Sequence, residues 1–211
     1  MFLPINFLST KTSREQLNTI EYLVVAGGGS GGTIGGGGGA GGFISSSFDL
    51  GSVFGETASL DIYVGDGGAP ANNSIGNNGD NSYISTSFTL NETAIGGGGG
   101  GYYVTTSGDG LSGGSGGGAR NTSKIDGPSG TGGTATSGQG YPGGAGFWDS
   151  TYAGGGKGLA GCGGGASEPG QDASRTKAGN GGDGKKWVDN RYYAGGGGGD
   201  QDDIADAGDG A

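Results

Sequence analysis

Histidine is absent from this chain of 211 residues, and cysteine occurs once, at Cys162. An internal disulfide needs two cysteines, so no disulfide can staple the fold. The usual zinc ligand sets and histidine-dependent catalysis are excluded for the same reason. Cys162 stands between glycines with no base beside it, which favours a small buried residue over a nucleophile.

Basic residues are also few: 10 Lys and Arg stand against 20 Asp and Glu, a formal net charge of −10. Proteins that bind nucleic acid or anionic membranes neutralise phosphates with Lys and Arg, so neither partner is expected. No apolar run approaches the length of a membrane span. The first residues lack a basic leader and include Pro4, which makes a poor signal peptide, so we expect synthesis in a cytoplasm without standard export.

Proline is scarce, at 5 residues, whereas glycine reaches 61. Collagen needs glycine at every third position with abundant proline, but here glycine comes in irregular runs, so collagen is excluded. Disorder is the common alternative for such a composition. One recurrence argues against disorder. Four strand-like segments, which end at residues 26, 95, 153 and 194, are each followed directly by a run of glycines. A flexible linker has no reason to repeat that junction.

Large apolar residues are unevenly placed, with 32 in residues 1–104 and 12 in residues 105–211. Five strand candidates lie in the first half: residues 21–26, 43–50, 58–64, 82–90 and 93–95. In the third, Leu60, Ile62 and Val64 share one face. We expect residues 51–57 to connect a hairpin of the second and third strands.

Asn91-Glu92 is the expected turn between the last two strands. The pattern predicts an all-β or irregular fold with essentially no α-helix, in which a small, jelly-roll-like β-sandwich continues into a glycine bundle.

Glycine runs can form structure as polyproline-II helices, which make no internal hydrogen bonds and can bond side by side when no Cβ intervenes. The sequence predicts a strand-rich core over residues 21–104 and a polyglycine-II bundle with exposed loops over residues 105–211. Residues 1–20 are expected to be a docking arm for other proteins, or a strand that joins the body. Replacing an interior glycine should be severe.

The sharpest catalytic or cofactor motif is a G-x-G-x-x-G at Gly27, Gly29 and Gly32 after a strand, with Asp49 near a ribose-binding position. It needs a helix to begin at those glycines, and more glycines follow instead, so no nucleotide site is expected. The acidic end, residues 200–209, lacks calcium-loop spacing. No carboxylate pair stands out for glycan cleavage. We therefore expect no cofactor, no metal and no enzymatic activity.

Aromatic and basic residues gather late in the chain, where eight of the ten bases lie after residue 105. Large aromatic side chains cannot fit inside a glycine lattice, so they should lie at its edges or on turns, where they would either cap the bundle or bind a partner. The candidate receptor-binding residues are Phe147, Trp148, Tyr152, Lys185, Lys186, Trp187, Arg191, Tyr192 and Tyr193.

Four stretches of the sequence each combine a strand-like segment with an adjacent run of glycines. They are residues 21–29, residues 35–43, residues 60–68, and Ala94-Ile95 before six glycines. This combination resembles the glycine-rich domain of phage tail-fibre proteins over about residues 21–200, and more loosely the distal tail-fibre adhesins of T-even-type phages. In those adhesins, polyglycine-II helices stack in a sandwich, and loops at one end bind host outer-membrane receptors.

The resemblance implies a virion protein of a tail fibre or tail tip. It would bind a host outer-membrane receptor or surface glycan, contact other virion proteins through residues 1–20, and act as a homotrimer or as a monomeric cap on a trimeric fibre. The alternative is a purely structural tail plug or a capsid or tail decoration. An ice-binding protein would want a flat face of small residues and several disulfides, which this chain lacks.

Overall fold

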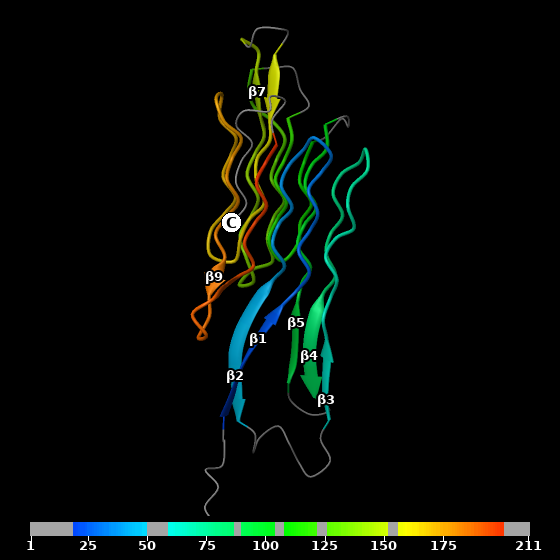
Figure 1. Ribbon diagram of the computed structural model, residues 1–211, viewed down its shortest axis with the longest axis vertical. Helices are drawn as coiled ribbons and strands as arrows, with labels where there is room; N and C mark the ends of the chain where they lie inside the picture. The colour runs from blue at the N-terminus through cyan, green and yellow to red at the C-terminus, as the bar shows by residue number, and fades with distance from the viewer. Residues whose placement is uncertain are drawn as a thin grey trace, which may run out of the picture.

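The computed structural model describes residues 19–49, 59–86, 90–103, 108–121, 126–151 and 156–200. Within these ranges the chain has ten short β-strands and no helix, so the prediction of an all-β, irregular fold without α-helix is confirmed. Figure 1 shows an elongated molecule, with β1 to β5 at one end, β7 at the other, and long parallel runs of irregular chain between them.

Five strands form two antiparallel sheets at the first end. β1 (Thr19–Val25) pairs with β2 (Phe43–Asp49), and the other sheet has the order β3 (Leu60–Tyr63), β4 (Ser82–Thr86) and β5 (Asn91–Ala94). The sheets pack face to face, because β1 contacts both β4 and β5 while β2 contacts β5. The buried apolar cluster between them comprises Tyr22, Val24, Ala26, Phe48, Ile84, Leu90 and Ala94.

One pairing expectation was wrong. β2 pairs back with β1, across the glycine excursion of residues 26–42, and β3 pairs with β4, so residues 51–57 do not connect a hairpin. The expected pairing of the strand in residues 82–90 with the next strand is confirmed by β4 and β5, but the turn was misplaced, because Asn91 and Glu92 lie inside β5. The second and third strand candidates were assumed to pair, whereas the glycine-rich residues 26–42 carry the chain away from β1 and return it so that β2 pairs with β1.

The remaining strands are shorter. β6 (Gly127–Pro128), β7 (Phe147–Asp149) and β8 (Lys157–Leu159) form a three-stranded antiparallel sheet. β9 (Lys185–Lys186) and β10 (Tyr192–Tyr193) form a hairpin. The first group lies at the end of the molecule remote from the sandwich, and β9 lies near the sandwich (Figure 1).

Between the two ends, glycine-rich segments bond to one another with a period of three residues. Every third amide of one segment donates to every third carbonyl of its antiparallel neighbour: Gly27 to Asp80, Ser30 to Asn77 and Thr33 to Ser74. Parallel neighbours keep the same period: Gly97 to Gly27 and Gly100 to Ser30. A period of three is that of the polyproline-II helix, so these segments form a polyglycine-II lattice.

The glycine run 96–101 is surrounded on all sides by this lattice. All of its N–H groups donate and all of its carbonyls accept, to and from segments before and after it in the chain. Two donors bond to side chains: the Gly96 amide to Asn81 Oδ1 (2.8 Å) and the Gly99 amide to Asn78 Oδ1 (2.9 Å). Complete pairing is what makes a buried polar backbone tolerable.

Segments from the two halves of the sequence are interleaved in this lattice. The Gly37 amide donates to Gly161 at 3.3 Å, and the Gly197 amide donates to Gly38 at 2.9 Å. Glycine is required where chains come closest: a Cβ on Gly97 would overlap the Gly39 carbonyl oxygen. The central part of the molecule is therefore stabilised by hydrogen bonds between glycine-rich segments that lack Cβ atoms, and not by apolar burial.

Candidate recognition surfaces

The predicted site residues fall into two groups in space. Phe147 and Trp148 lie on β7 at the remote end, whereas Lys185 to Tyr193 lie on the β9–β10 hairpin near the sandwich (Figure 1). Tyr152 lies outside the described residues. The structure therefore does not bring the predicted residues into one patch, and each group is a separate surface.

Trp148 is not exposed. Only 7% of it is accessible, and a Cβ on Gly156 would meet its indole ring. Gly156 has φ of 101°, a left-handed conformation that glycine adopts without strain, and this lets the chain pass close to the ring. Trp148 thus packs within the β6–β8 sheet, one of the two roles considered for the aromatic residues, while its neighbour Phe147 remains half-buried.

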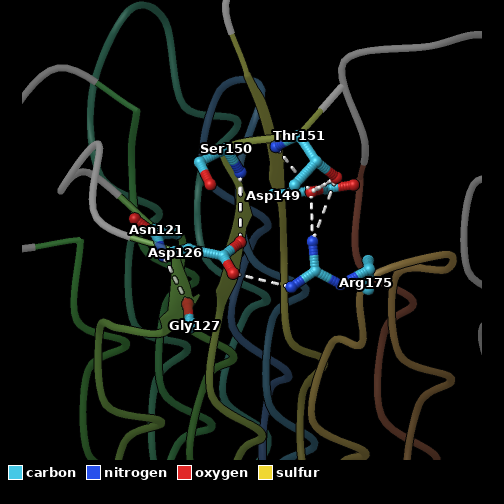
Figure 2. A network of polar contacts seen from close by, with 7 residues as sticks. All are labelled: Asn121, Asp126, Gly127, Asp149, Ser150, Thr151 and Arg175. Carbon is cyan, nitrogen blue, oxygen red and sulfur yellow. Dashed lines mark hydrogen bonds and ion pairs between the residues drawn. The ribbon is translucent and has the colours of Figure 1, made fainter. Parts of the chain in front are cut away.

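Figure 2 shows an ion-pair network centred on Arg175. The guanidinium donates to Asp126 Oδ2 at 2.6 Å and to Asp149 Oδ1 at 2.5 Å, and it stands 5.7 Å from the centre of the Phe147 ring. Asp126 precedes β6 and Asp149 ends β7, so Arg175 ties a separate loop to both strands.

Hydroxyl and amide donors complete the network. The Ser150 amide donates to Asp126 (3.1 Å), and both the amide and the hydroxyl of Thr151 donate to Asp149 Oδ1, at 2.9 and 2.7 Å. The hydrogen bond from Arg175 lowers the pKa of Asp126, and those from Thr151 lower the pKa of Asp149. Asp126 in turn raises the pKa of Arg175. Carboxylates held ionised in this way suit structure and charge recognition, not general-acid catalysis.

Sequence reasoning missed Asp126, Asp149 and Arg175. Arg175 stands in a polar stretch with no aromatic residue beside it, and its two partners lie 49 and 26 residues away. Only the lattice geometry brings them together. The available signal was the excess of acids over bases, which favours an ion pair for Arg175, but nothing in the spacing names the carboxylate.

The β9–β10 hairpin is attached to the outer face of the β1–β2 sheet. Trp187 Nε1 donates to Ser45 Oγ at 3.2 Å, and Lys185 Nζ lies 5.3 Å from the centre of the Phe43 ring. The turn closes by two hydrogen bonds, from the Trp187 amide to the Arg191 carbonyl and from the Asn190 amide to the Trp187 carbonyl, and Asn190 has a left-handed φ of 67°. Trp187 is therefore an anchor of the hairpin.

The outer part of this hairpin is exposed. Tyr192 is 70% and Val188 64% accessible, and Lys186 and Arg191 are also exposed. Tyr193 donates its hydroxyl to Asp189 Oδ2 at 2.7 Å, which lowers the pKa of Asp189 and raises the pKa of Tyr193. The hairpin thus presents an aromatic and basic edge with a fixed turn.

In the parts of the chain that the structure describes, no cluster of three or more acidic, cysteine or histidine ligands occurs. No helix in those parts is long and apolar enough to cross a bilayer.

Comparison with known proteins gives one match. No curated protein and no solved structure matches this chain. A sequence profile described as a glycine-rich domain matches residues 6–211, almost the whole chain. The interleaved lattice within residues 27–200 accounts physically for that match, since glycines from both halves of the sequence lie where a Cβ would overlap a neighbouring backbone. The chain belongs to this family of glycine-rich domains.

Proposed function

We propose that this protein is a receptor-binding component of a phage tail fibre or tail tip, carried on the virion, that contacts the host cell through its β6–β8 end. The observation that carries the proposal is the Arg175 network, which fixes three chain segments at the end of the molecule farthest from the sandwich. A preorganised end loses little conformational entropy on binding, which favours affinity.

The chemistry of this end suits a polar partner. It combines the partly exposed Arg175, the half-buried Phe147 ring and exposed hydroxyl-bearing residues such as Ser150 and Thr151. Aromatic and arginine side chains are enriched where proteins recognise partners. An outer-membrane receptor loop or a surface glycan offers matching groups. The resemblance to phage tail-fibre domains supplies the biological setting of the proposal.

A second candidate is a purely structural virion component. The exposed side chains of Val188 and Tyr192 on the hairpin favour it, since an exposed apolar and aromatic edge suits permanent contact with another subunit. In that case the β9–β10 hairpin, and not the β6–β8 end, would carry the contacts that matter.

Binding of the labelled, purified protein to a panel of bacterial strains tests both candidates. Three variants are compared with wild type: Arg175→Gln and Phe147→Ala at the remote end, and Tyr192→Ala on the hairpin as the matched control. Circular dichroism verifies that each variant is folded. Trp148→Ala is unsuitable, because Trp148 is buried and its loss would disturb packing.

We expect saturable binding to at least one strain that is reduced by Arg175→Gln and Phe147→Ala and unchanged by Tyr192→Ala. Folded wild-type protein that binds no strain would contradict the adhesin and favour the structural role. Binding lost only in Tyr192→Ala would move the receptor contact to the hairpin.

A further inference from the structure

Acidic and basic residues are segregated along this chain. No Lys or Arg occurs between Arg14 and Arg120, whereas nine acidic residues lie in that stretch. The stretch includes all five strands of the sandwich, so these strands contribute negative charge alone. Bases reach this end of the molecule on the β9–β10 hairpin, which carries Lys185, Lys186 and Arg191.

The outer face of the β3–β5 sheet is aromatic and acidic. Tyr63 on β3 pairs with Tyr83 on β4, and the centres of their stacked rings are 5.5 Å apart. Because strand residues alternate between faces and Ile84 lies in the core, both tyrosines point away from the core. Tyr63 is 47% and Tyr83 39% exposed. Asp61 is also exposed, and it lies two residues before Tyr63 on the same face.

A depression of about 490 Å³ lies against this pair of tyrosines. Asp80, which is exposed, lines it from the segment before β4. Asp61 and Asp80 therefore place carboxylates on either side of the rings along the strand direction. We call Asp61, Tyr63, Asp80 and Tyr83 the acidic tyrosine face. Aromatic rings flanked by carboxylates suit a Lys or Arg side chain.

The outward side of the β9–β10 hairpin carries complementary groups. Trp187 points toward the β1–β2 sheet, where its indole donates to Ser45. Its neighbour Lys186 points the other way, together with its pairing partner Tyr192. Tyr192 is 70% exposed, and Arg191 beside it is exposed as well.

We propose that the β9–β10 hairpin of one copy of this chain docks on the acidic tyrosine face of a second copy. In this contact the two bases of the hairpin, Lys186 and Arg191, meet the two carboxylates of the face. Tyr192 packs against the exposed tyrosine rings. The contact covers an aromatic side chain and two bases on one copy with an aromatic and acidic surface on the other.

The positions of the two surfaces require two copies. The hairpin lies on the outer face of the β1–β2 sheet, and the acidic tyrosine face belongs to the outer face of the other sheet. The two surfaces are therefore on opposite sides of the sandwich, as the places of β9 and β3 in Figure 1 show. The contact is heterologous, since each copy offers a different surface, and contacts of this kind close into rings or extend into chains.

This inference rests on neither candidate function, because its test uses the purified protein alone. The hairpin spans nine residues, 185–193, and buries less area than a standard interface. The contact is therefore weak and forms at high protein concentration. Dilute labelled protein is a single copy, so its binding to cells does not depend on this contact.

Exchanging the charges of the two surfaces tests the contact. The hairpin variant combines Lys186→Glu with Arg191→Glu, and the face variant combines Asp61→Lys with Asp80→Lys. All four side chains are exposed, so the substitutions leave the interior unchanged. Sedimentation velocity of the full-length protein over a range of concentrations measures association, and circular dichroism verifies folding. Lys177→Glu, at an exposed base outside the hairpin, is the matched control.

We expect wild type and the control to associate as the concentration rises, and to dissociate in about 1 M salt, where the screening length falls to about 3 Å. Each charge variant alone should associate about tenfold or more weakly, because its two surfaces then carry charge of the same sign. An equimolar mixture of the two variants should associate again, since each hairpin meets a face of opposite charge. Both variants keep a negative net charge, so overall charge cannot explain this rescue.

Three results would overturn the proposal. Wild-type protein that stays a single copy at every concentration would show that the contact does not form. Association that neither charge variant weakens would place the contact elsewhere on the molecule. A mixture of the two variants that does not associate would show that the hairpin and the acidic tyrosine face do not meet.

Discussion

At the scale of single residues, whether a position requires glycine depends on which atoms an added Cβ would contact. In Gly97→Ala the added carbon overlaps the Gly39 carbonyl oxygen, and the backbone cannot move without breaking neighbouring hydrogen bonds. We expect a loss of about 3 kcal/mol or more in the free energy of unfolding. Gly28→Ala is the matched control, because its nearest atom is the Gly39 carbonyl oxygen at 3.7 Å. Urea denaturation measures both, and equal losses would contradict a close-packed lattice.

The side chain of Asn81 takes the place of a backbone carbonyl as a hydrogen-bond acceptor in the lattice. Its carbonyl oxygen accepts the amide of the buried Gly96. Asn81→Ala should cost about 1–3 kcal/mol, because it leaves a buried donor without its partner. Asn72→Ala, at an exposed position, serves as the control and should be near neutral in the same urea titration.

Cys162 should make stability depend on alkaline pH. Its thiol donates to the Gly179 carbonyl and accepts the Gly199 amide at 2.9 Å, and burial raises its pKa from 9.0 to about 12. The folded state therefore holds the proton more tightly than the unfolded state. Its contribution is complete below pH 9.0 and is lost as the pH rises toward about 12.

The comparison with Cys162→Ala isolates this effect, since the tyrosines titrate in both proteins. The advantage of wild type over the variant in urea midpoint should shrink between pH 9 and pH 12. A constant difference across that range would show that the thiol is not buried in the way described.

At the scale of elements, the alternating and apolar runs located the strands well, because a strand pattern is local. Residues 21–26 and 43–50 correspond to β1 and β2 within a residue or two. Pairing was mispredicted because it depends on the path of residues 26–42, and a glycine run has no side-chain pattern that encodes a path. Leu60 and Ile62 share one face of β3 as expected, but both are exposed, which the alternating pattern could not predict.

The two recognition surfaces could also be predicted only in part from the sequence. Residue types predicted that aromatic side chains would lie at lattice edges, and both Trp148 and Trp187 do so. Whether each one packs or stays exposed is decided by single neighbours, such as Gly156 beside Trp148 and Ser45 beside Trp187. The Arg175 network could not be predicted, because its members meet only through the lattice.

The Arg175 network should also respond to acid. Asp126 and Asp149 have lowered pKa values in the folded state, so their contribution is present above the ordinary value of 3.8 and is lost as the pH falls through the lower folded values. Wild type should have a higher urea midpoint than Arg175→Gln at pH 7, and the difference should close near pH 2. A difference that persists in acid would mean that Arg175 acts through packing and not through charge.

At the scale of the whole molecule, hydrogen bonds join both halves of the chain into one lattice. The run 96–101 bonds to segments on either side of it in sequence, and Gly37 and Gly161 are joined directly. Unfolding should therefore be a single cooperative transition. Tryptophan fluorescence reports on Trp148 and Trp187 at the two ends, and far-ultraviolet circular dichroism reports on the backbone. Separate midpoints for the two probes would show that unfolding is not a single transition.

Native-state hydrogen exchange of the glycine amides tests most directly the claim that the glycine runs are structure. The amides of Gly97, Gly98 and Gly100 are buried and bonded within the lattice, so they should exchange only through global unfolding, with the same free energy as the amide of Val24 in the sandwich core. Exchange of these glycines at the rate of an unstructured peptide, while Val24 stays protected, would contradict the account.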